Sequence, residues 1–225
     1  TRTILKATQE VYEGTRLVAR LEPPKCALEH IRARQQLRAA AGAYAMMPEQ
    51  LSHSLGTPIT TDSSDYAEIL HELKCRLGRL EGKRVHDVGC GTGGALIAFK
   101  TLGMNASGSE PGIEGKLAAA KLGLNIANVG GERALQNHSG RFDAVVSLNV
   151  LGGSVNRKKR LEILDAAREK TDLQVHSLFN DSLGDRRDFL AEGWRTTFTP
   201  LAEIKTVVVI ERIKPNKNQT EREVV

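Results

Sequence analysis

The residues best suited to chemistry lie in a glycine-rich segment and one apolar run beyond it. The segment is Asp87-Val88-Gly89-Cys90-Gly91-Thr92-Gly93-Gly94, and Glu110 comes at the end of the next run. Glycines let a ligand approach the backbone closely, and a helix that starts after them presents free N–H groups. A carboxylate at Glu110 can accept hydrogen bonds from both hydroxyls of a ribose. We therefore expect a nucleoside-binding site at the carboxyl ends of these strands.

Two classes of nucleoside cofactor fit this pattern. Gly89, Gly91 and Gly94 satisfy the dinucleotide fingerprint, with Glu110 at about the expected spacing of roughly 20 residues. Asp87, just before the glycines, favours the other class. A carboxylate there would repel a pyrophosphate, whereas it would attract the ammonium group of an amino acid. This argues against a nicotinamide-dependent oxidoreductase.

Three motifs resemble those of the class I S-adenosylmethionine-dependent methyltransferases. They are Asp87-Val88-Gly89-Cys90-Gly91-Thr92-Gly93, Ser109-Glu110-Pro111 and Phe142-Asp143-Ala144-Val145-Val146-Ser147. The resemblance covers about residues 80–212. It implies an α/β fold with a Rossmann-like, seven-stranded, mostly parallel sheet, flanking helices and an antiparallel last strand. It also implies S-adenosyl-L-methionine as the cofactor.

The resemblance also implies which residues bind the cofactor. Asp87 and the glycine turn would hold the methionine part, and Glu110 would hold the ribose. Glu132 stands one position from the acidic residue that meets the adenine amino group in the family. Asn149 either contacts a ligand or caps the following turn. The implied cofactor-binding residues are Asp87, Gly89, Cys90, Gly91, Gly93, Glu110, Pro111, Glu132 and Asn149.

Two positions depart from the family pattern. His86 stands where an apolar residue is usual. Residues 149–154 do not form the Asn/Asp-Pro-Pro-aromatic motif of many DNA and some protein amine methylases, which disfavours those substrates. The resemblance identifies no catalytic residue.

The elements that position these residues follow from alternating short apolar runs and helical stretches after Gly82. Strands are predicted at 84–88, 106–109, 125–128, 142–150, 173–179, 194–198 and 206–210. Helices are predicted at 95–102, 113–122, 161–170 and 186–191. This pattern predicts an S-adenosylmethionine-binding domain over residues 81–213.

Residues 1–80 are predicted to be a mostly helical extension that acts as a lid over the cofactor. Helices are expected at 6–21, from 25 to about 45, and from 64 to about 80. Residues 214–225 are polar and are expected to be a disordered tail.

A run of four basic residues follows the predicted strand 142–150: Arg157, Lys158, Lys159 and Arg160. Cations at the start of a helix oppose its dipole, so a partner such as RNA is one interpretation. A solvated surface is the other. The net charge of +5 permits an anionic partner without requiring one.

Composition bounds the remaining expectations. The three cysteines (Cys26, Cys75 and Cys90) form no C-x-x-C, which predicts no metal site and a cytoplasmic or other reducing intracellular location. No apolar run approaches the roughly 18 residues of a membrane span. We expect a methyltransferase that acts on a small molecule or, second, on RNA. The alternative is a catalytically inactive member of the fold that serves as a structural or RNA-binding subunit.

Overall fold

The computed structural model describes residues 9–21, 63–179, 183–200 and 205–214. The helix expected at 25–45 and all but residue 214 of the tail expected at 214–225 lie outside these residues. Within them, no helix is both long enough and apolar enough to cross a membrane.

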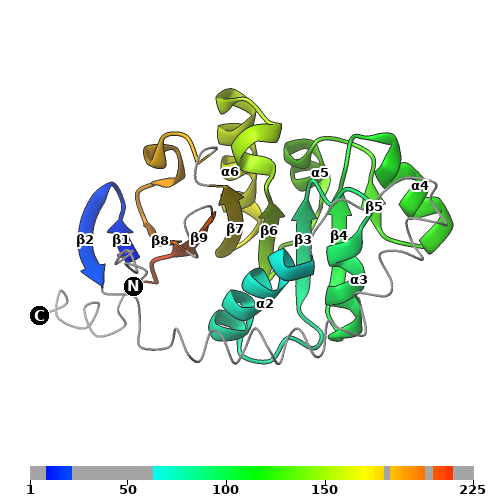
Figure 1. The fold of residues 1–225 in the computed structure, drawn as a ribbon, viewed down its shortest axis with the longest axis horizontal. Coiled ribbons are helices and arrows are strands. Elements are labelled where there is room, and N and C mark those ends of the chain that lie inside the picture. The colour runs from blue at the N-terminus through cyan, green and yellow to red at the C-terminus, as the bar shows by residue number, and fades with distance from the viewer. Residues whose placement is uncertain (1–8, 22–62, 180–182, 201–204, 215–225) are drawn as a thin grey trace, which may run out of the picture.

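A single sheet forms the centre of the described molecule (Figure 1). Its strands in spatial order are β2 (Arg16–Leu21), β1 (Gln9–Glu13), β8 (Trp194–Pro200), β9 (Lys205–Arg212), β7 (Leu173–Phe179), β6 (Ala144–Leu148), β3 (Arg84–Val88), β4 (Asn105–Ser109) and β5 (Ile126–Ala127). The pairs β3–β4, β3–β6, β4–β5 and β6–β7 are parallel, and the other four pairs are antiparallel. The described sheet therefore has nine strands with evenly mixed pairing. The expectation of seven mostly parallel strands was wrong in both respects.

The additional strands come from the N-terminal segment. The expected helix at 6–21 is wrong over its described part, because β1 and β2 form a hairpin that pairs antiparallel with β8. Gly14 makes the turn with a φ of 59°, and the Tyr12 ring packs edge-on against Phe198 at 5.7 Å. Alternating side chains such as Val11 and Tyr12 suit a pleated surface, and a distant strand provides that surface.

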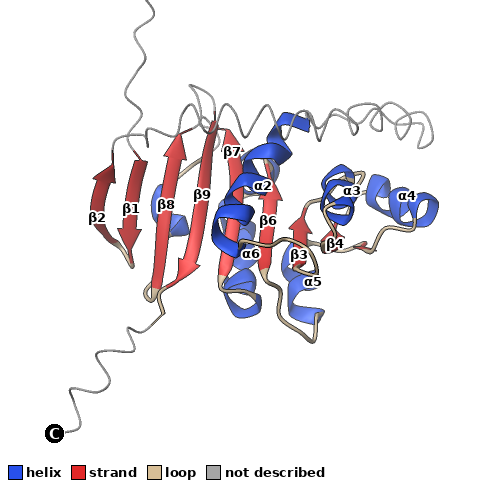
Figure 2. Cartoon of the chain, turned by 90° about the horizontal axis from the view of Figure 1, so that it is seen from below, coloured by secondary structure: helices blue, strands red, loops and turns tan. Residues whose placement is uncertain are grey.

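Helices cover both faces of the sheet (Figure 2). The helices α2 (Ser63–Leu77), α3 (Gly94–Thr101) and α4 (Ile113–Leu122) contribute buried apolar residues to one core. The helices α5 (Gly131–Asn137) and α6 (Arg157–Lys170) and the 3-10 turn η3 (Arg186–Phe189) contribute to the other. A one-turn π-helix, η1 (Val150–Ser154), follows β6. The sequence predicted neither α5 nor η1, and it placed the start of α6 four residues late.

Candidate functional site

A cavity of about 850 Å³ opens where the chain leaves the carboxyl ends of β3, β4, β5 and β6. Ligands of open α/β sheets bind in this position, where the strand order reverses. Eight of the nine residues predicted to bind a cofactor line the cavity: Asp87, Gly89, Cys90, Gly91, Glu110, Pro111, Glu132 and Asn149. Gly93 does not line it.

Three glycines of the turn after β3 have different roles. A Cβ on Gly89 would lie 2.4 Å from a methyl group of Val150, so Gly89 lets η1 pack against the turn. A Cβ on Gly93 would lie 2.4 Å from Leu124, so Gly93 supports the turn from behind. A Cβ on Gly91 would meet no atom within 4 Å. All three have positive φ, and Gly91 leaves an open backbone face toward the cavity.

Asp87 is buried at the floor of the cavity and is only 2% exposed. Its Oδ1 accepts no hydrogen bond from the described residues. Burial, and then the nearby charge of Glu110, raise the pKa of Asp87 to about 8. A buried acceptor without a donor is unfavourable, so the site favours a ligand that brings a donor or a positive charge.

Glu110 is fixed by the backbone on both sides. Its Oε2 accepts from the N–H of Gly91 at 3.1 Å, and its Oε1 accepts from the N–H of Gly112 at 2.8 Å. The Asn128 side chain donates to the backbone carbonyl of Glu110 at 2.9 Å. Each carboxylate oxygen has a second lone pair. Glu110 can therefore accept further hydrogen bonds from a ligand without changing its position.

Glu132 reaches the cavity because α5 packs closely against β3. A Cβ on Gly131 would lie 2.3 Å from Val88, so only glycine permits this approach. Glu132 is 7% exposed, and its Oε1 accepts from Nζ of Lys159 at 2.9 Å. Its Oε2 is buried and accepts no hydrogen bond from the described residues. One carboxylate oxygen therefore still needs a donor.

Cys90 is a packing residue of the turn. A Cβ on Gly108 would lie 2.6 Å from its Sγ, so β4 makes room for the thiol. Burial, followed by the charges of Asp87 and Glu110, raises the pKa of the Cys90 thiol far above its ordinary value. The thiol therefore stays protonated and is not a nucleophile.

Asn149 ends β6 in the left-handed conformation, with a φ of 57°. Its N–H donates to the carbonyl of Ser177 at 2.8 Å, and its own carbonyl accepts from the Ser154 hydroxyl at 3.2 Å. These bonds bend the chain from β6 into η1 across the mouth of the cavity. Positive φ outside glycine is uncommon and is often found at functional sites.

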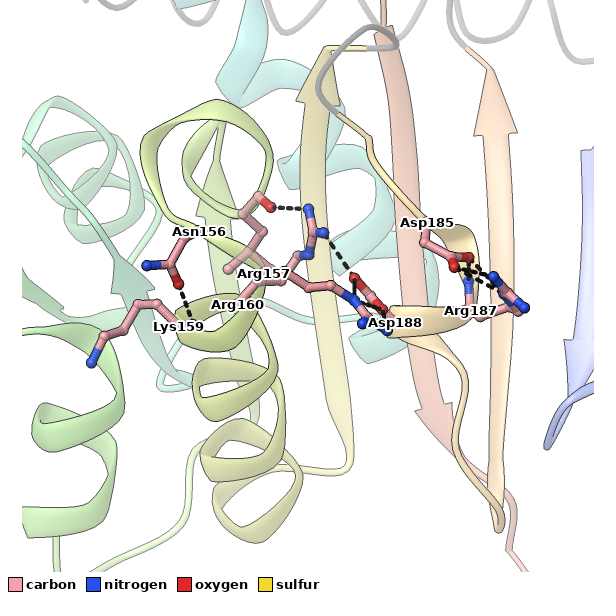
Figure 3. A network of polar contacts seen from close by, with 8 residues as sticks. Asn156, Arg157, Lys159, Arg160, Asp185, Arg187 and Asp188 are labelled. Atoms are coloured by element: carbon pink, nitrogen blue, oxygen red, sulfur yellow. Dashed lines mark hydrogen bonds and ion pairs between the residues drawn. The ribbon is translucent and has the colours of Figure 1, made fainter.

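The basic run forms ion pairs within the chain (Figure 3). Arg157 and Arg160 both contact the Asp188 carboxylate, whose side chain is 1% exposed, at 2.8 Å. Lys159 pairs with Glu132 and Glu162 at 2.9 Å. Lys158 is 88% exposed. The run therefore connects α6 to η3 and α5, which the sequence did not predict because these acids lie far along the chain or in unpredicted elements.

Among the described residues, no group of three or more His, Cys, Asp or Glu side chains is arranged to hold a metal ion. His71 and Cys75, which have the spacing of a metal pair, contact one another at 3.5 Å.

No family model and no curated protein sequence matches this chain. Several solved structures share its fold. A Thermoplasma acidophilum protein is 23% identical over 73% of this chain and 96% of its own, with a TM-score of 0.51. A proposed RNA methyltransferase from Pyrococcus horikoshii is 17% identical over 75% of this chain and 100% of its own, with a TM-score of 0.52.

A third similar structure is a T. thermophilus 16S rRNA methyltransferase in complex with AdoMet and guanosine. It is 18% identical over 68% of this chain and 44% of its own, with a TM-score of 0.51. At these identities the likeness concerns the fold. The chain shares the fold of these methyltransferase structures, and its β1–β2 hairpin forms one edge of the described sheet.

Proposed function

We propose that this protein is an S-adenosylmethionine-dependent methyltransferase with a small-molecule acceptor. The observation that carries the proposal is Asp87: a buried carboxylate at the glycine turn, with one oxygen that accepts no hydrogen bond from the described residues. The ammonium group of the methionine part is a donor and a cation, and it would restore the ionised form of Asp87.

The other residues of the cavity fit the remaining parts of this cofactor. Gly91 leaves its backbone open to the cavity. Glu110 is held rigidly with lone pairs to spare for the ribose hydroxyls. Glu132 has a buried oxygen available for the adenine amino group. Pro111 and Asn149 complete the wall, and Gly93 supports the turn from behind.

The chemistry needs little from the side chains beyond alignment. The cofactor supplies a methyl group on a sulfonium, and the acceptor's lone pair takes it in a direct displacement. The protein holds donor and acceptor in line and excludes water, and no covalent enzyme intermediate is needed. This is consistent with a protonated Cys90 thiol and with His86 and His176 buried in the sheet outside the cavity lining.

We propose a small acceptor and not RNA because most cations of the basic run already form ion pairs within the chain. Three of its four cations pair with acids of the same chain at 2.9 Å or less: Arg157, Lys159 and Arg160. Cations already paired in this way release fewer counterions on binding a nucleic acid, and this release provides most of the affinity.

Calorimetric titration with S-adenosylmethionine and S-adenosylhomocysteine tests the proposal. We expect micromolar-range binding by the native protein and a loss on the order of tenfold or more in Asp87→Asn and in Glu110→Gln. Asp165→Asn, at an exposed carboxylate of α6, is the matched control and should bind as the native protein does. A screen with labelled methyl donor would then compare small molecules with RNA.

If the folded native protein binds neither ligand at millimolar concentration, the proposed methyltransferase activity is excluded. Strongly salt-dependent binding of RNA in its place would indicate a structural or RNA-binding subunit. Binding of reduced nicotinamide dinucleotide, followed by its fluorescence, would indicate an oxidoreductase.

A further inference from the structure

Lys159 and Glu132 form a donor–acceptor pair on the wall of the cavity. They come from different helices, since Glu132 lies in the first turn of α5 and Lys159 in the first turn of α6. Lys159 Nζ lies 2.9 Å from Glu132 Oε1, and both residues line the cavity. The proposed function uses Glu132 but leaves Lys159 without a role.

The start of α6 is fixed so that Lys159 faces the cavity. Asn156 caps the helix, because its Oδ1 accepts from the N–H of Lys159 at 2.9 Å. Arg157 and Arg160 hold the same helix turn to Asp188. In Figure 3 the Lys159 side chain points away from Asp188, toward the opposite side of the helix. We call the contacts of Arg157 and Arg160 with Asp188 the Asp188 clamp. The clamp and the Asn156 cap together fix the direction of the Lys159 side chain.

The pair offers a ligand one acceptor and one donor side by side. Glu132 Oε2 is buried and accepts no hydrogen bond from the described residues, so it is an acceptor in need of a donor. The Lys159 ammonium group has three N–H bonds, and within the described residues it contacts Glu132 and Glu162. One N–H therefore remains for a ligand.

We infer that Glu132 and Lys159 together read the base edge of adenine: Glu132 accepts from the exocyclic amino group and Lys159 donates to ring nitrogen N1. The inference rests on the proposed function, since it requires an adenosine cofactor in this cavity. Adenine presents a donor and an acceptor side by side on this edge. Hypoxanthine presents the reverse, an oxygen acceptor beside an N–H donor. The pair therefore distinguishes the two bases.

The test is calorimetric titration of the whole protein with S-adenosylhomocysteine and S-inosylhomocysteine. The native protein should bind the adenosyl ligand at least about tenfold more tightly. Lys159→Met should weaken adenosyl binding by about tenfold, because one charge-assisted hydrogen bond is lost. Lys158→Met, at the neighbouring side chain that is 88% exposed, should leave both affinities unchanged.

A charge-swapped protein provides a second readout that a purely structural role would not change. Glu132→Lys combined with Lys159→Glu keeps an ion pair at the same place but exchanges donor and acceptor. It should reverse the preference and favour the inosyl ligand. Circular dichroism and thermal unfolding check that each variant remains folded.

The outcomes separate the inference from the proposed function. If the native protein binds neither ligand, both are overturned. If it binds the adenosyl ligand and Lys159→Met binds it equally or more tightly, only the inference is overturned. Lys159 would then be a structural partner of Glu132 that the base does not contact.

Discussion

Among single residues, Asp87 lowers the free energy of unfolding of the ligand-free protein at neutral and higher pH. Its pKa is raised to about 8 by burial and by Glu110, whereas an unfolded Asp titrates near 4. The folded state therefore keeps a proton that the unfolded state loses, and the contribution of this carboxyl to stability falls as pH rises from about 4 to 8.

We expect Asp87→Asn to stabilise the empty protein at pH 8 by roughly 2 kcal/mol, since the neutral amide can be buried without taking up a proton. Urea unfolding at pH 5 and pH 8 measures this, and the gain should be smaller at pH 5. Asp165→Asn is the exposed control. An equal or lower stability of Asp87→Asn at pH 8 would contradict this account of the site.

Asp87 also predicts a proton linkage of binding. An ammonium ligand favours the ionised carboxylate, so binding of S-adenosylmethionine at pH 7 should release close to one proton. Titrations in two buffers of different ionisation enthalpy measure this number. The release should disappear in Asp87→Asn; its persistence would assign the proton to another group.

An apolar residue was expected at position 86, and the structure explains how His86 is accommodated there. Its two ring nitrogens contact the hydroxyls of Ser107 at 3.0 Å and Ser109 at 3.2 Å. The ring lies 5.1 Å from that of Phe142. A neutral imidazole is therefore satisfied at this position. Burial, with a smaller effect of His138, lowers the pKa of His86 to about 4.

The buried histidines predict acid sensitivity. Burial lowers the pKa of His176 to about 3, with a smaller effect of Arg168. Unfolded histidine binds a proton near pH 6.5, so the free energy of unfolding should fall below that pH by about 1.4 kcal/mol per unit for each buried ring. Denaturant unfolding at several pH values from 7.5 to 4.5 measures this fall. The free energy of unfolding should decrease less steeply with falling pH in His86→Asn than in the native protein.

At the scale of elements, the Asp188 clamp positions α6 and η1 together. Arg160 donates to Asp188 at 2.8 Å and to the carbonyl of Leu151, within η1, at 3.0 Å. Val150 of the same π-helix packs on Gly89 of the cofactor turn. The clamp thus connects η3, α6 and the wall of the cavity through consecutive contacts.

Breaking the clamp should be costly because Arg160 is buried. Asp188→Asn removes the charge that compensates this guanidinium, and we expect a loss of about 3 kcal/mol in the free energy of unfolding. Arg187→Met breaks the exposed pair with Asp185 nearby and should lower the free energy of unfolding far less, because solvent screens exposed ion pairs. Equal losses in the two variants would show that the clamp is not a structural element of the fold.

At the scale of the whole molecule, the N-terminal hairpin and the cofactor cavity lie in different parts of one sheet. In Figure 1, β1 and β2 lie at the opposite end from β5. Five strand-to-strand steps separate β1 from β3, or about 24 Å at roughly 4.8 Å a step. Changes in the hairpin should therefore alter the free energy of unfolding without altering the affinity for the cofactor.

Tyr12→Ala tests this separation. Loss of the ring that packs against Phe198 should lower the free energy of unfolding by about 2 kcal/mol, while S-adenosylhomocysteine binds unchanged. Tyr12→Phe keeps the ring and should lose far less. A drop in affinity along with stability would mean that the hairpin and the cavity are coupled through the sheet.

Elements that depend on neighbouring residues could be predicted before folding was considered. The strand at Leu173–Phe179 and the helix at Ile113–Leu122 match the predicted bounds, because side-chain periodicity records the faces that each element buries. The glycine turn could be recognised because its backbone adopts positive φ angles, which favour glycine. These features sufficed to place eight of the nine candidate residues around one cavity.

Features that depend on partners far along the chain became visible in the folded protein alone. Residues Gln9–Leu21 form a strand hairpin, and its strand β1 pairs with β8, far along the chain. The short helix α5 packs closely against β3 because Gly131 has no Cβ to meet Val88. The basic run is neutralised by Asp188 and Glu132, which no local pattern connects to it. Ion pairs and sheet edges form between surfaces brought together by folding, so their energies cannot be read from neighbouring residues.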